Sequence, residues 1–161
     1  IAITDYNNKI KNFKKALYYI NKAINIDSEN VLYWKRYGKI NYRLNLYEEA
    51  EVGYRKTLEL GNYELNSWLT RNDILLKLGE FEAAKNNLFQ AKEFYQESAE
   101  IEYRLAGLFF KNLEFNQGEF HLKNALKLDS EFLIIIEELF PKVYSLKKVK
   151  EIIKVHKKAS L

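Results

Sequence analysis

An internal period of 34 residues constrains the fold of this chain more than any other feature of its sequence. Trp34 aligns with Trp68 when the sequence is shifted by one period, and Ile26–Glu29 returns as Leu128–Glu131 three periods later without an insertion. A strict period of this length indicates a stack of equal units, each burying the apolar face of its neighbour. The clearest fixed columns are Tyr47/Phe81/Phe115, Ala50/Ala84/Gly118 and Thr57/Ala91/Ala125.

The composition favours an all-helical chain. Six Gly and one Pro among 161 residues are too few for a fold built of strands and turns. The 47% hydrophobic content excludes a disordered chain, and the absence of Cys excludes disulfides, zinc–thiolate sites and a cysteine nucleophile. The net charge of +4 arises from 26 basic and 22 acidic residues, so it does not by itself indicate a nucleic-acid partner.

The residue spacing within each copy predicts two helices joined by a short turn. In the second copy, Trp34 and Gly38 follow helical spacing, and Asn45–Leu46 forms the turn to the next helix. Gly79 occupies the same turn in the third copy, where a left-handed residue ends a helix at little cost. Small residues such as Gly38 and Ala84 are expected to let neighbouring helix axes approach closely.

This pattern resembles the tetratricopeptide repeat (TPR) family, whose 34-residue units have fixed aromatic, small and Pro columns. Tyr47–Ala50 and Phe81–Ala84 are similar to the most characteristic stretch of that family. Glu102 departs from the pattern, because it stands where the family has Trp. Asp27 and Asp129 are expected to cap the following helices in place of the missing Pro. The residues in the Pro column are Ser28, Asn62, Gln96 and Ser130. The resemblance implies an all-α, right-handed α-solenoid of helix-turn-helix repeats.

The period divides residues 1–132 into copies at 1–30, 31–64, 65–98 and 99–132. The first helix of the copy at 1–30 is expected to be cut short, because the register places about four residues of that copy before Ile1. Residues 133–161 keep helical spacing but lose the columns, so they predict a degenerate repeat with C-terminal capping helices. Glu137–Pro141, followed by a Lys-rich helix, is similar to the ends of TPR proteins from the Bacteroidota.

No motif in the sequence indicates catalysis. His121 and His156 are isolated in the sequence, and the repeat register places His121 on the outer surface of a second helix. The chain contains no His-Glu-x-x-His motif, glycine-rich phosphate loop or Gly-x-Ser-x-Gly turn. Acidic pairs such as Glu48 and Glu49 lie at helix starts, where they stabilise the positive end of the helix dipole. We therefore expect no catalytic residue, no metal site and no cofactor.

The resemblance implies that the first helix of each copy lines a concave groove. The second copy then presents a cationic helix face, with Lys35, Arg36, Lys39 and Arg43 near Tyr42. Cations beside apolar rings suit a protein or peptide partner of acidic and aromatic or apolar character. The residues expected to line the groove are Lys35, Arg36, Lys39, Tyr42, Arg43, Leu69, Asp73, Leu76, Tyr103, Arg104, Phe110 and Lys111.

Charge pairing gives an alternative interpretation of the same face. Lys39 is expected to neighbour Asp73, and Glu100 and Arg104 are an i,i+4 pair, so the groove can be a solvated surface without a partner.

The two-carboxylate clamp of chaperone-binding TPR domains is excluded. Its two Asn positions are lost here, and Glu100 replaces a Lys and would repel a carboxylate.

Two further functions stay open beside the expected non-catalytic protein–protein interaction module. The repeats can be a structural segment of a longer solenoid in a multi-subunit assembly, because the first copy is incomplete. The Lys-rich helix over 142–158 can contact a membrane or nucleic acid, but apolar residues at core spacing favour a capping helix with a solvated face. A protein or peptide is therefore the expected partner, and the sequence indicates neither a compartment nor an oligomeric state.

Overall fold

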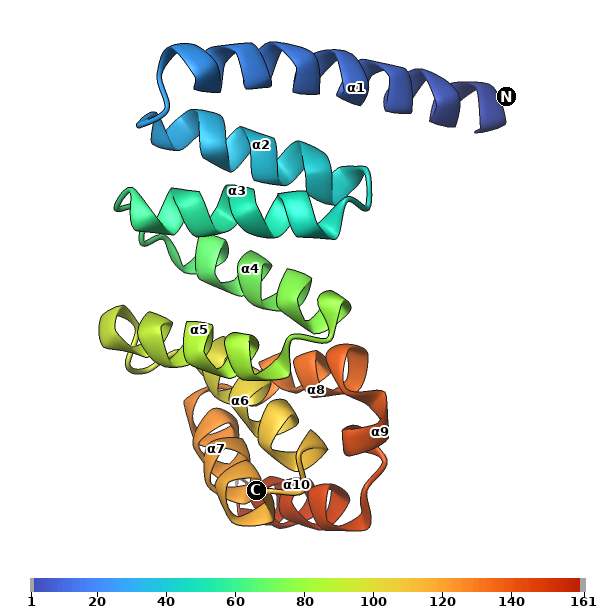
Figure 1. Ribbon diagram of the computed structural model, residues 1–161. Helices are drawn as coiled ribbons and strands as arrows, with labels where there is room; N and C mark the ends of the chain where they lie inside the picture. Colours follow the sequence, from blue (N-terminus) through green and yellow to red (C-terminus); the bar gives the residue numbers. More distant parts are fainter. Residues whose placement is uncertain (1, 160–161) are drawn as a thin grey trace. The chain divides into compact units, whose positions relative to one another are not determined.

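The computed structural model describes residues 2–159, which form ten α-helices and one short 3₁₀ helix without any strand (Figure 1). The expectation of an all-α chain is confirmed. The helices are α1 (Ala2–Ile26), α2 (Val31–Arg43), α3 (Tyr47–Glu59), α4 (Leu65–Leu78), α5 (Phe81–Phe94), α6 (Ala99–Lys111), α7 (Phe115–Leu128), η1 (Ser130–Leu133), α8 (Ile134–Leu139), α9 (Pro141–Tyr144) and α10 (Lys147–Ala159).

The chain divides into two compact units, Ile1–Asn87 and Leu88–Leu161, with the boundary inside α5. In the first unit α1 packs on α2, α2 on α3 and α3 on α4, as expected for antiparallel helices in chain order. In the second unit α6 and α7 form the corresponding pair, and η1, α8 and α9 pack on α6 while α10 packs on α7. The final segment therefore does not repeat the arrangement of the copies before it.

The turns inside the helix pairs share one backbone feature. Asn45 has φ 59°, Gly79 has φ 78° and Leu113 has φ 63°, and these three left-handed residues stand 34 positions apart. The prediction that Gly79 ends a helix in the left-handed conformation is confirmed. A period visible in the sequence is thus matched by a period in backbone geometry, although Leu113 bears a Cβ that disfavours this conformation.

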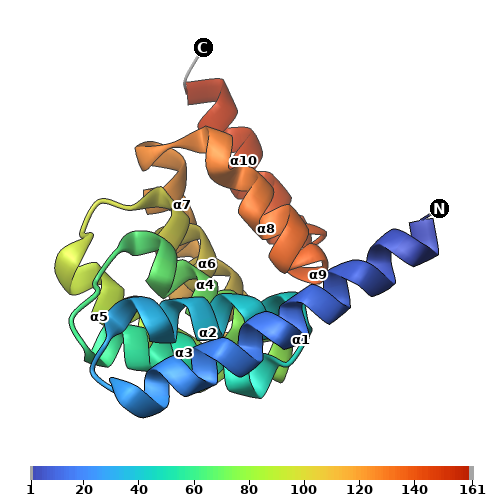
Figure 2. The same cartoon turned by 90° about the horizontal axis from the view of Figure 1, so that it is seen from above.

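The first copy differs from the prediction of a helix pair. Its residues form the single long helix α1, whose N-terminal end extends beyond α2 in both views (Figures 1 and 2). Lys11 stands in the column of Asn45 and Gly79, yet it lies within the helix. Lys is a good helix former, and it adopts the left-handed conformation less readily than Asn or Gly. The helix therefore continues where the other copies turn.

Close packing of α2 on α3 depends on two glycines. A Cβ on Gly53 would lie 2.5 Å from the backbone N and Cα of Gly38, and a Cβ on Gly38 would lie 2.9 Å from the Tyr54 ring. The expected role of Gly38 in close approach is confirmed, and Gly53 supplies the facing half of the contact. Ala84 and Ala91 of α5 are fully buried, as their columns predict.

Helix capping follows the expectation only in part. Asn30 caps α2, because its side chain accepts a hydrogen bond from the backbone N–H of Leu32 at 3.2 Å. Asp27, which we expected in this role, instead accepts from the Asn30 amide at 3.1 Å and so orients the capping residue. Asp129 does cap the next element, η1, by accepting from the backbone N–H of Glu131 at 2.8 Å.

Candidate functional site

The cationic face of α2 is the part of the expected groove that the structure leaves open. Arg36, Lys39 and Arg43 are exposed and form no ion pair with any residue whose side chain the structure describes. Their spacing of three and four residues places them along one side of the helix. Lys35 differs, because it is half-buried and its ammonium forms an ion pair with Glu64, the N-cap residue of α4.

The pairing that would neutralise this face is absent. Lys39 makes no ion pair with Asp73, although the two were expected to be neighbours. The helix also carries Leu32 one turn before Arg36 on the same side, and its side chain is 63% exposed. Leu32 and the three cations therefore share one solvent-exposed side of α2.

The other expected groove residues of the first unit contribute mainly to packing. Tyr42 is half-buried, with its ring 5.9 Å from that of Tyr47 in an edge arrangement, and it packs on a buried cluster that includes Tyr54. Leu69 is buried, and Leu76 is half-buried. These residues therefore offer little open apolar surface.

The expectation that Tyr103, Arg104 and Phe110 line an open groove is wrong, because all three are buried in the second unit. The Tyr103 hydroxyl donates to the backbone oxygen of Asp129 at 3.0 Å, and burial raises the pKa of Tyr103 well above its usual value. Arg104 donates to the backbone oxygen of Glu100 at 3.2 Å. Phe110 packs against α7, where a Cβ on Gly118 would lie 2.8 Å from its ring.

The chain's own C-terminal segment covers this face of α6. A Cβ on Gly107 would lie 2.2 Å from the ring of Phe140, so only a glycine allows this ring to reach the helix. Phe140 joins α8 to α9, and both short helices pack on α6. Lys111, at the end of α6, is the one expected groove residue of the second unit that is exposed. Residues 133–161 lack the repeat columns, so no repeat signal indicates this covering.

The structure also corrects the expected surface position of His121. Its side chain is buried on α7, with Nδ1 2.6 Å from Oε2 of Glu102 and its ring stacked on Phe109 at 5.1 Å. Lys92 forms an ion pair with the other oxygen of Glu102. Burial raises the pKa of Glu102, but the bonds from His121 and Lys92 outweigh it and hold this pKa below its usual value.

A sequence signal for the burial of His121 exists in the column it occupies. One and two periods earlier stand Asn87 and Gly53, and both are buried. Glu102 replaces the Trp of the first-helix column, and it is this carboxylate that gives the buried histidine a partner. The three polar side chains satisfy one another inside the second unit, so they form a structural cluster and not an accessible reaction centre.

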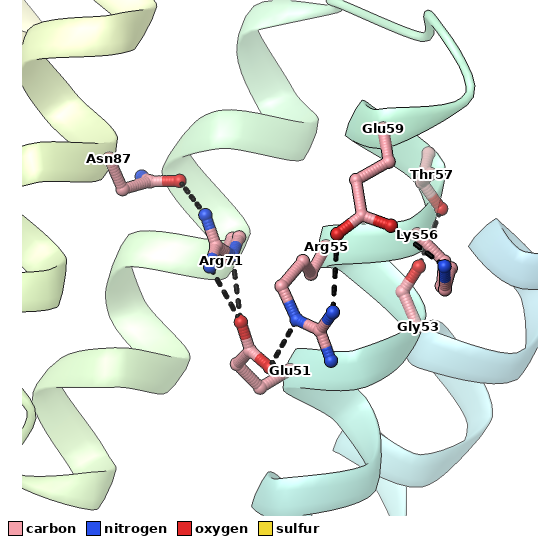
Figure 3. Close-up of polar contacts among 8 residues, drawn as sticks. All are labelled: Glu51, Gly53, Arg55, Lys56, Thr57, Glu59, Arg71 and Asn87. Carbon is pink, nitrogen blue, oxygen red and sulfur yellow. Dashed lines mark hydrogen bonds and ion pairs between the residues drawn. The ribbon is translucent and has the colours of Figure 1, made fainter.

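A second polar cluster holds α3, α4 and α5 together in the first unit (Figure 3). Arg71 of α4 donates two hydrogen bonds to Oε1 of Glu51 on α3, at 2.7 and 2.9 Å, and one to Oδ1 of Asn87 on α5 at 3.1 Å. Arg55 donates to the second oxygen of Glu51 at 3.3 Å. Each charged group is paired, so this cluster also stabilises helix packing.

Metal-binding clusters and membrane-spanning helices are absent from the part of the chain that the structure describes. Within residues 11–159, whose side chains the structure describes, no three His, Asp or Glu side chains gather as a metal ion would require. Across the same residues, no helix combines the length and the apolar character needed to cross a bilayer.

Comparisons with known proteins agree with the repeat architecture. No protein-family model and no curated protein sequence matches the chain. The crystal structure of MamA matches with a TM-score of 0.74 and 19% identity, covering 99% of this chain and 93% of that one. A MamA fragment from Desulfovibrio magneticus RS-1 matches with a TM-score of 0.71 and 17% identity, covering 97% and 91%.

A third solved structure is described as YrrB, a TPR protein with an unusual peptide-binding site. It matches with a TM-score of 0.69 and 17% identity, covering 94% of this chain and 78% of that one. At identities of 17–19% these likenesses show the fold. The chain is a TPR-fold protein, and the resemblance inferred from its repeat columns is confirmed.

Proposed function

We propose that this protein is a non-catalytic protein–protein interaction module that binds an acidic segment of its partner on the cationic face of α2. The observation that carries the proposal is the row formed by Arg36, Lys39 and Arg43, which are exposed and unpaired within the described side chains. A fold gains no stability from three neighbouring like charges, because each raises the electrostatic energy of the others.

The spacing of the row indicates the chemistry of the partner. Arg36 and Arg43 are seven positions apart, which corresponds to about 10 Å along a helix. A peptide with carboxylates two or three residues apart can reach all three cations, and the two guanidinium groups can each bind a carboxylate with two parallel hydrogen bonds. Leu32 supplies the neighbouring apolar contact that Tyr103 and Phe110 were expected to provide.

The fold likeness supports a peptide or protein partner in general terms. YrrB is described as having a peptide-binding site, and its fold covers most of this chain. The acidic character of the partner rests on the α2 row alone.

The test is a double charge reversal, Arg36→Glu with Arg43→Glu, in a pull-down from the native source followed by binding kinetics at two salt concentrations. We expect association to slow by about tenfold or more at low salt and to lose its salt dependence, because steering by opposite charge is removed. The matched control is Lys14→Glu with Lys15→Glu, which makes the same charge change on exposed residues of α1. Unchanged partners and unchanged kinetics in the α2 variant would exclude this face.

A further inference from the structure

A cavity of about 390 Å³ lies between α7 and α10 in the second unit. Leu126 and Ile152 are its buried apolar residues, and Val155, which is 68% exposed, stands at its edge. Lys123, Lys127 and Lys148 also line it. The cavity is therefore apolar within and cationic at its rim, and its volume falls in the range of about 300–1,000 Å³ that is usual for binding sites.

The repeat explains why this cavity exists. Glu119 and Lys123 stand two periods after Glu51 and Arg55. On α3, Glu51 binds Arg55 and also Arg71 of the next packed helix (Figure 3). On α7, Glu119 binds Lys123 at 2.7 Å and Lys148 of α10 at 2.8 Å.

In both sets the acidic residue also binds a cation on a helix that packs against its own, Arg71 of α4 or Lys148 of α10. Helix α4 belongs to a full repeat, whereas α10 belongs to the segment that has lost the repeat columns. Its side chains do not fill the face of α7 completely, and the cavity is the part that they leave uncovered.

The cavity is lined by three Lys against Glu119 and Glu151, and one of its two walls, α10, is strongly basic. Helix α10 carries six Lys and His156 against the single acid Glu151. Glu119 is bound by two Lys, and these bonds lower the pKa of Glu119 to about 2, so its negative charge is already offset. Lys127 forms no ion pair with any side chain that the structure describes.

We propose that this cavity is a second docking site, which takes a short amphipathic segment of a partner protein with aliphatic side chains facing inward and carboxylates facing the lysines. The aliphatic groups would cover Leu126 and Val155, and the carboxylates would meet Lys127 and its neighbours. The site is independent of the α2 face. A protein segment is favoured over a membrane or nucleic acid because the apolar surface formed by Leu126 and Ile152 is recessed, where aliphatic side chains can enter.

The test uses the full chain and a synthetic twelve-residue helical peptide with leucine on one face and glutamate on the other. Backbone amide NMR shifts are followed during titration, and a scrambled peptide of the same composition serves as the ligand control. We expect saturable shifts confined to α7 and α10 for the designed peptide, and at least tenfold weaker binding of the scrambled one.

Three variants locate the site. Val155→Glu puts a charge at the apolar edge without disturbing buried packing, and we expect at least tenfold weaker peptide binding. Lys127→Glu is expected to weaken peptide binding by about threefold to tenfold. Lys142→Glu, an exposed reversal on α9, is the matched control and should bind like the wild type. The double reversal of Arg36 and Arg43 should also leave this binding unchanged, which separates the site from the proposed function.

Each contrary result overturns the proposal. Wild-type affinity in Val155→Glu, or shifts that map outside α7 and α10, would show that the cavity does not bind the peptide. Vesicles of phosphatidylserine and a single-stranded oligonucleotide are titrated in parallel. Shifts on α10 with either of these, in the absence of shifts with the peptide, would assign the helix to a membrane or to nucleic acid instead.

Discussion

Glu102 is the residue whose chemistry departs most from its repeat column. It replaces a Trp, yet it is only 2% exposed and holds both His121 and Lys92. A buried carboxylate needs such partners, because its desolvation costs several kcal/mol. The substitution thus exchanges an apolar contact for a set of charge-assisted bonds that joins α5, α6 and α7.

The pH dependence of stability follows from this cluster. The pKa of Glu102 is lower in the folded chain than when unfolded, so its stabilisation is complete above the unfolded pKa and is lost as pH falls through the folded one. At pH 7, Glu102→Gln should lower the free energy of unfolding by about 3 kcal/mol, since it removes the buried carboxylate that pairs with the half-buried Lys92. Urea unfolding from pH 7 to pH 3 should show the difference between variant and wild type narrowing.

Glu97→Gln is the control for that series, because Glu97 is exposed and lies outside the cluster. Its effect on the free energy of unfolding should be small at every pH. A difference between Glu102→Gln and the wild type that stayed constant down to pH 3 would show that charge does not carry the stabilisation.

Backbone conformation at Leu113 gives a second residue-level prediction. Leu113 has φ 63°, a left-handed conformation that its Cβ makes unfavourable. Its side chain is 72% exposed, so burial does not compensate for this strain. Leu113→Gly should therefore raise the free energy of unfolding by about 0.5–1 kcal/mol. This figure is the backbone strain that Gly relieves, reduced by the greater conformational entropy that Gly gives the unfolded chain. Thermal unfolding of Leu128→Gly provides the contrast: Leu128 lies within α7 and is exposed, so the same change should destabilise. A Leu113→Gly variant less stable than wild type would contradict this account.

At the scale of helices, the distance between α2 and α3 is set by two glycines with different neighbours. A Cβ on Gly53 would meet the backbone of α2 at 2.5 Å, whereas a Cβ on Gly38 would meet the Tyr54 ring at 2.9 Å. A ring can shift more readily than a helix backbone. Gly53 therefore limits the approach of the helices more strictly than Gly38.

Paired alanine variants measure this difference. Gly53→Ala should lower the free energy of unfolding by about 1–3 kcal/mol, because the overpacking outweighs the better helix propensity of Ala. Gly38→Ala should cost less, since the Tyr54 ring can give way. Chemical denaturation of both variants under one set of conditions makes the comparison, and an equal or larger loss for Gly38→Ala would show that the ring is the stricter limit.

At the scale of the whole chain, the first helices of the copies differ in what covers them. In the first unit the cationic face of α2 is exposed to solvent, whereas in the second unit η1, α8 and α9 cover α6 and Phe140 lies beside Gly107. The final segment thus acts as a cap on one helix and leaves a cavity against another.

Much of this architecture could be predicted from the repeat columns. They predicted the helix pairs, the turn at Gly79, the buried Ala84 and Ala91 and the close approach at Gly38, and the structure confirms each, apart from the first copy with its single helix. These features depend on contacts between near neighbours in the chain, and every full copy makes the same ones. A residue type kept at one position in several copies therefore reveals its surroundings.

The features that sequence analysis missed depend on contacts that occur once. The burial of Tyr103 and Phe110, the pairing of His121 with Glu102 and the cavity beside α10 each arise where a copy departs from its neighbours. The columns could not predict these features, because they arise from residue types that differ from the rest of their column, such as Glu102 and His121, or from a covering segment outside the repeats, such as Phe140. The groove residues of α2 could be named from the repeat register, but whether a helix face is open or covered depended on how the non-repeating end of the chain folds back.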